Sequence, residues 1–184
     1  MNDSNLNEAL REFEAENYDS ARSLMERLTD KKEVKLQLAY LYQKGLGGPS
    51  EPERAIEIYK TLADTGDVQG MYYLASLLME RRQLDGAGYY YEKSAELGHV
   101  SGAYWAAALH EGLYGHPRDD KKYQRFIKHA ARLGHLFAKR DIERSNMRNA
   151  KNLVVRTQAL LRYFLMKIKG LYIVIRNSYD LRLR

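Results

Sequence analysis

The chain has 184 residues, a formal net charge of +6, three prolines and no cysteine. This length supports one sizeable core, and the lack of cysteine excludes disulfides, thiolate metal ligands and cysteine nucleophiles. The polar start lacks the apolar core of a secretion signal, and no uncharged apolar run approaches the ~20 residues of a membrane span. We therefore expect a cytoplasmic protein.

Three helices are expected before residue 50. Apolar residues recur at helical spacing over 4–16, then from Ala21 to Leu28, and then from about Lys31 to Tyr42. The third helix is expected to end in the glycine-rich segment 45–49, because glycine at a helix end followed by proline is a common terminator.

Three helix pairs are predicted next, over 51–65 and 67–80, 86–97 and 99–111, and 119–133 and 135–147. A glycine separates the helices of each pair, as a tight turn with positive φ requires. These structural turn glycines are Gly66, Gly98 and Gly134, spaced by 32 and 36 residues. A repeat of this length is the signature of a helical solenoid.

Segments 60–66, 93–99 and 129–135 share alanine-then-glycine helix ends, and 41–47 contains a tyrosine followed by Gly-Leu-Gly. Over about residues 19–148 the chain thereby resembles the Sel-one-like repeat family of the tetratricopeptide superfamily. The usual Leu-Gly of the second helix is replaced here, for example by Leu74-Ala75. The resemblance implies an all-α, right-handed superhelical solenoid over residues 1–148 and a C-terminal capping helix within a basic extension, 149–184.

No catalytic, cofactor-binding or metal-binding residue is predicted. His99 and His135 occupy equivalent places after the turn glycines and are interpreted as turn or helix-cap residues. The other three histidines, His110, His116 and His129, lack metal-ligand spacing, and segment 45–50 lacks the Gly-Lys-Ser/Thr ending of a phosphate loop. We therefore expect no enzyme activity.

Three aromatic residues stand where sister repeats carry polar or charged residues. They are Tyr73, Tyr89 and Trp105. Tyrosine and tryptophan are favoured at binding hot spots, so one hypothesis makes these three the partner-binding site. The alternative is that irregular packing between repeats covers them.

The extension 149–184 carries eight basic residues and one acid, Asp180. Its large apolar residues form a helical stripe that continues through Leu171 to Ile175. The predicted packing residues of the tail are Leu153, Leu160, Phe164 and Ile168. The tail either caps its own solenoid, pairs with a partner or a second copy, or lies on an anionic membrane surface; we expect packing on protein. Nucleic-acid binding is not expected, because the basic residues alternate with large aliphatic ones.

These patterns favour a non-enzymatic scaffold or adaptor that binds a protein or peptide partner through its repeats. The alternative is a peripheral membrane-associated assembly protein, docked at the inner membrane by its basic C-terminal helix. A homo-oligomer formed through that helix is a further option. The family resemblance implies a bacterial signalling or envelope-assembly role.

Overall fold

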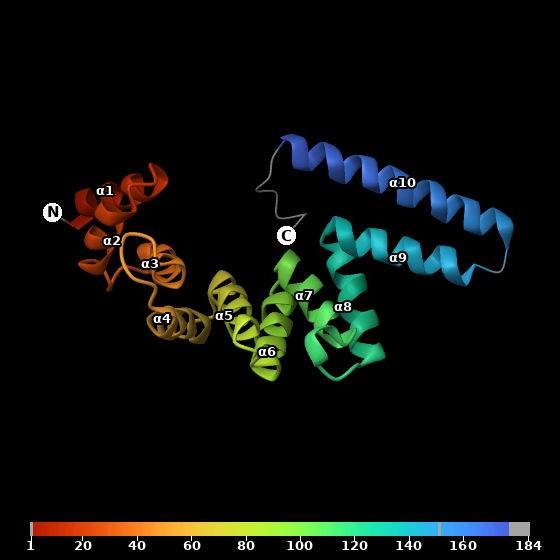
Figure 1. The fold of residues 1–184 in the computed structure, drawn as a ribbon, viewed down its shortest axis with the longest axis horizontal. Coiled ribbons are helices and arrows are strands. Elements are labelled where there is room, and N and C mark those ends of the chain that lie inside the picture. Colours follow the sequence, from red (N-terminus) through yellow and green to blue (C-terminus); the bar gives the residue numbers. More distant parts are fainter. Residues whose placement is uncertain (1, 151, 177–184) are drawn as a thin grey trace. The chain divides into compact units, whose positions relative to one another are not determined.

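A computed structural model describes residues 2–150 and 152–176, and the side chains over 4–150 and 152–173. Over these residues the chain forms helices and no strand (Figure 1). The chain divides after Gln83 into two compact units. The first contains α1 (Asn2–Glu14), α2 (Tyr18–Glu26), α3 (Lys32–Lys44), α4 (Pro52–Asp64) and α5 (Val68–Glu80). The second contains α6 (Leu84–Glu96), α7 (Val100–His110), the short 3-10 helix η1 (Leu113–Gly115), α8 (Asp120–Arg132), α9 (Leu136–Asn149) and α10 (Leu153–Arg176).

The predicted helix pairs are present as α4 and α5, α6 and α7, and α8 and α9, which confirms an all-α repeat fold. Gly66, Gly98 and Gly134 lie between the paired helices with φ of +83°, +90° and +102°. A Cβ atom placed at any of them would have no neighbour within 4 Å. The left-handed backbone conformation, rather than lack of space, is therefore what favours glycine at these turns.

The residue after each turn glycine caps the second helix of its pair. The Gly70 amide donates to Asp67 Oδ1 at 2.8 Å, and the Gly102 amide donates to His99 Nδ1 at 2.9 Å. His135 Nδ1 accepts from the Ala138 amide at 3.3 Å in the same way. Each cap satisfies a backbone N–H that has no partner within its own helix.

Paired helices approach closely where the second helix carries a small residue. A Cβ atom on Gly70 would lie 2.5 Å from Leu62 Cβ, so no larger residue fits without movement. Gly102 occupies the equivalent place against the buried Ser94. The buried Tyr59 and Tyr91 fill the core beside these contacts.

A buried arginine of the first unit holds the glycine-rich loop after α3. Arg22 donates to the Pro49 carbonyl oxygen at 2.9 Å and pairs with Glu51 at the start of α4. It also pairs with Glu26 at 3.2 Å, and its guanidinium lies 4.5 Å from the centroid of the Tyr42 ring. The charge is thus paired inside a core, as a buried charge requires. Sequence analysis had not singled out Arg22.

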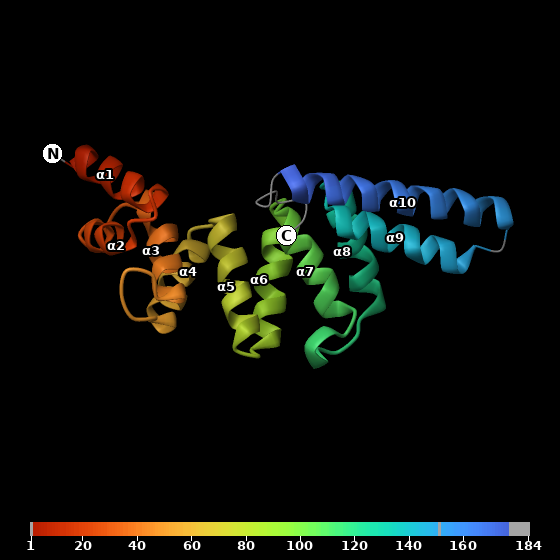
Figure 2. The same ribbon diagram turned by 45° about the horizontal axis from the view of Figure 1, so that its top comes forward.

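The second unit is centred on α7, whose buried residues surround the helix and include Ala103, Ala106, Ala107 and Ala108. Helix α7 packs on both α6 and α8. Helix α9 lies between α8 and α10 (Figure 2), and α9 and α10 pack along each other. No helix in the described part of the chain is long and apolar enough to cross a membrane.

Candidate functional site

Two of the three predicted partner-binding aromatics extend the core of their own repeat. Tyr73 stacks on the buried Tyr59, with ring centroids 5.6 Å apart and an interplanar angle of 19°. Trp105 stacks on the buried Tyr91 in the same way, at 6.3 Å and 20°. Both are half-buried. This arrangement supports the packing alternative for these two side chains.

Tyr89 is different, because 56% of its surface is exposed on α6. Its ring meets Tyr90 edge-on at 5.0 Å, and Lys93 Nζ lies 5.8 Å from its centroid. Tyr89 and Trp105 belong to the second unit, whereas Tyr73 belongs to the first. Of the predicted three, Tyr89 is the side chain most available to a partner.

The two histidines that cap helices are buried, and burial lowers the pKa of His99 to about 4. A neutral ring with its proton on Nε2 is required for Nδ1 to accept the Gly102 amide. The described residues contain no group of three or more His, Asp or Glu side chains placed to hold a metal ion.

A half-buried polar cluster connects α6 to α7 and α8. Glu92 accepts from Lys122 Nζ at 2.9 Å and lies 2.6 Å from His110 Nε2. Burial alone would raise the pKa of the Glu92 carboxyl, but the hydrogen bonds from Lys122 and His110 hold it below its ordinary value. The His110 ring also stacks on Phe126 at 6.0 Å. The cluster therefore connects three helices and stabilises their packing.

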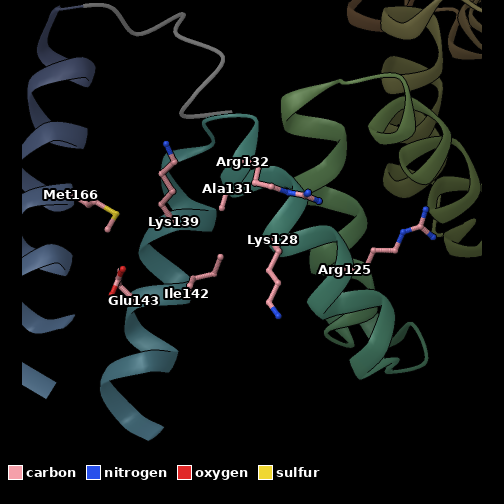
Figure 3. Close-up of a pocket in the computed structure, with 8 residues that line it drawn as sticks. All are labelled: Arg125, Lys128, Ala131, Arg132, Lys139, Ile142, Glu143 and Met166. Carbon is pink, nitrogen blue, oxygen red and sulfur yellow. The ribbon is translucent and has the colours of Figure 1, made fainter. Parts of the chain in front are cut away.

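A groove of about 730 Å³ lies among α8, α9 and α10 (Figure 3). Its apolar lining comes from one residue of each helix, Ala131, Ile142 and Met166. Figure 3 shows Ile142 directed toward α8 and Met166 directed toward α9. Four of its other lining residues are basic, and they are Arg125, Lys128, Arg132 and Lys139.

The charges of this groove are only partly neutralised. Arg125 turns away from it and pairs with Glu96 of α6 at 3.1 Å. Among the described residues, no ion pair forms at Lys128, Arg132 or Lys139, and all three are exposed.

Glu143 adds a hydrogen-bond acceptor to the groove. It pairs with Arg162 of α10 through Oε1 at 3.3 Å. Its Oε2 atom is buried and has no hydrogen-bond partner among the described residues. A buried acceptor without a partner favours a ligand that supplies a donor. Sequence analysis missed this groove because three helices contribute to it.

Helix α10 packs on α9 through a face that the sequence stripe did not identify. Ala159 is fully buried and Ile173 nearly so, with Tyr163 and Met166 half-buried between them. The Tyr163 hydroxyl accepts from Arg144 of α9 at 3.4 Å. Spacings of four, seven and fourteen residues place these side chains on one line of the helix.

The four residues predicted to pack are exposed instead. Their exposed fractions are 74% for Leu153, 39% for Leu160, 53% for Phe164 and 65% for Ile168. These four side chains therefore do not cover the chain's own repeats in this structure, and their packing on a second copy stays a prediction. The small Ala159 and the polar partners of Arg162 and Tyr163 place the opposite side of α10 against α9. The side chain of Ile175, which continues the stripe, lies outside the described residues.

No family model matches the chain, and no curated protein matches it. Solved structures do match. A Sel1 repeat protein from Oxalobacter formigenes is 22% identical, with a TM-score of 0.73 over 90% of this chain and 68% of that one. A protective antigen with an SLR fold, c5321 of uropathogenic Escherichia coli, is 19% identical, with a TM-score of 0.69. That match covers 84% of this chain and 34% of the antigen, so the chain spans about a third of that protein.

These likenesses agree with the helix pairs described above. The expected Sel-one-like repeats are confirmed at the level of the fold: the chain has the fold of the Sel1-like repeat proteins.

Proposed function

We propose that this protein is a non-enzymatic scaffold whose groove among α8, α9 and α10 holds a segment of a protein partner. The observation that carries the proposal is an apolar lining bordered by Lys128, Arg132 and Lys139, which form no ion pair among the described residues. A preformed site of this kind binds without the cost of ordering itself.

The chemistry of the groove specifies the partner segment. An aliphatic or aromatic side chain fits the apolar lining of Ala131, Ile142 and Met166. Aspartate or glutamate side chains fit the three cations, and a backbone N–H of the segment fits Glu143 Oε2. The proposed partner is therefore an acidic peptide segment with one apolar anchor. Tyr89 on α6 offers a second, exposed contact for the same partner.

The test is selection from a displayed library of random peptides, followed by fluorescence anisotropy with the enriched peptide. We expect enriched sequences that combine acids with an aliphatic or aromatic residue. Lys128→Glu should weaken binding of that peptide about tenfold, because a like charge then faces its acids.

Lys60→Glu is the matched control, since Lys60 is an exposed lysine on α4 of the first unit. It makes the same charge change away from the groove and should leave the affinity unchanged. Enrichment of basic peptides, or equal weakening by both variants, would exclude the groove as the binding site.

A further inference from the structure

The side of α10 that faces away from α9 is apolar along most of its length. Ile168 is nine residues from Ala159, which is two and a half helical turns, so it lies opposite the buried contact with α9. The neighbouring large side chains on this outer side are exposed as well. They are Leu160, Leu161, Phe164 and Leu165.

This outer face is much broader than the narrow seam of a two-stranded coiled coil. At 100° per residue, its apolar side chains extend from Leu160 on one edge to Leu165 on the other, about 140° around the helix. A paired helix covers a narrower stripe than this. An apolar face this broad is covered better by a flat apolar layer, such as a lipid bilayer, than by a second helix.

The charges of α10 are of one sign. The helix contains no acidic residue between Leu153 and Arg176. Arg156 and Lys167 lie along one side of it, and Arg162 and Lys169 lie along the other. The apolar face is therefore bordered on both sides by cations, of which Arg162 pairs with Glu143 of α9.

The charge pattern discriminates between a second copy and a lipid surface. Two α10 helices meeting face to face would bring rows of like charge together, with no acid on either helix to pair with them. In an anionic bilayer, by contrast, the apolar side chains insert among the acyl chains and the basic side chains contact the lipid phosphates. We propose that α10 docks in the plane of an anionic phospholipid bilayer through its outer face.

The docking face and the groove are separate surfaces of α10. Met166 lines the groove on the side toward α9 (Figure 3). Ile168 is 65% exposed, and helical spacing places it on the opposite side of α10. A variant at Ile168 therefore tests the lipid surface without touching the groove, and Lys128→Glu tests the groove without touching the lipid face.

The experiment is co-sedimentation of the full chain with vesicles of phosphatidylglycerol and phosphatidylcholine, and with vesicles of phosphatidylcholine alone. We expect binding to the anionic vesicles, weaker binding to the neutral ones, and loss of the difference in high salt. Ile168→Glu should lower the partition coefficient about tenfold or more, because a charge replaces an apolar side chain at the interface.

Gln158→Glu is the matched control, because it adds the same charge at an exposed polar position of α10 outside the apolar face. It should lower vesicle binding by much less than Ile168→Glu does. Circular dichroism of both variants checks that the helices remain. Light scattering of the protein without lipid completes the test. A dimer that Ile168→Glu converts to a monomer would assign the face to a second copy, and absence of vesicle binding would equally overturn the proposal.

Discussion

At the scale of single residues, the clearest features are the turns between paired helices. A left-handed glycine is followed at once by a side chain that caps the next helix, and the same geometry occurs three times. The glycine was predictable because few residues adopt positive φ at low cost. Aspartate is the capping residue in one turn and histidine in the other two. The cap at His99 makes stability depend on pH, which the spacing of the sequence did not reveal.

Replacing Gly98 tests the turn conformation. Gly98→Val should destabilise the protein by more than ~1 kcal/mol, because a β-branched residue is strained at φ of +90°. Gly98→Asn should cost less, since asparagine tolerates the left-handed region. Urea unfolding of both variants measures the difference, and equal losses would argue against conformational strain as the cause.

The histidine cap at His99 predicts a dependence of stability on pH. Its pKa in the fold is about 4, below the ordinary 6.5, so the unfolded chain binds the proton more readily. Stability from this group is complete above about pH 6.5 and is lost as the pH falls toward about 4. His99→Asn keeps a capping side chain but does not titrate, so its melting temperature should fall less over that range.

The stacked aromatics predict a difference in stability between two substitutions. Trp105→Ser should lower the melting temperature clearly, because it removes a ring stacked on the buried Tyr91. Tyr89→Ser should change the melting temperature little, because Tyr89 is mostly exposed. Similar losses in the two variants would contradict these assignments.

At the scale of helices, apolar periodicity predicted the elements well but not every contact. The pairs from α4 to α9 begin and end close to the expected residues, because each carries one apolar face and a clear turn signal. In α10 the large apolar residues extend around the helix, so their spacing could not show which side meets α9. The buried side contains Ala159 and polar contacts from Tyr163 and Arg162, which hydrophobicity alone ranks low.

Overfilling this contact tests the packing of α10. Ala159→Leu should destabilise the protein by about 1–3 kcal/mol, because Ala159 is fully buried against α9. The neighbouring Leu160→Ala should cost less, since Leu160 lies on the outer side. Hydrogen exchange across α10 should rise in the first variant and not in the second. The reverse order would restore the original stripe as the packing face.

At the scale of the whole molecule, positive charge is concentrated in the C-terminal extension. With eight basic residues and one acid, the extension 149–184 has a net charge of +7, against +6 for the whole chain. The groove cations that form no ion pair among the described residues also lie in the second unit. Repeat spacing predicted the fold class because every unit repeats the same local rules. Contacts between helices determine three further features, and no local sequence pattern encodes such contacts. These features are the groove, the polar cluster around Glu92 and the division after Gln83.

The contacts of Arg22 determine where the chain can change in length. Its guanidinium bridges α2, the Pro49 carbonyl of the loop and Glu51 at the start of α4, so an added residue in 45–51 would pull these groups apart. The loop between α7 and α8 is held differently, with Leu113, Tyr114 and Gly115 exposed. Insertions and deletions should therefore accumulate at 112–116 among relatives of this chain, while 45–51 keeps a fixed length.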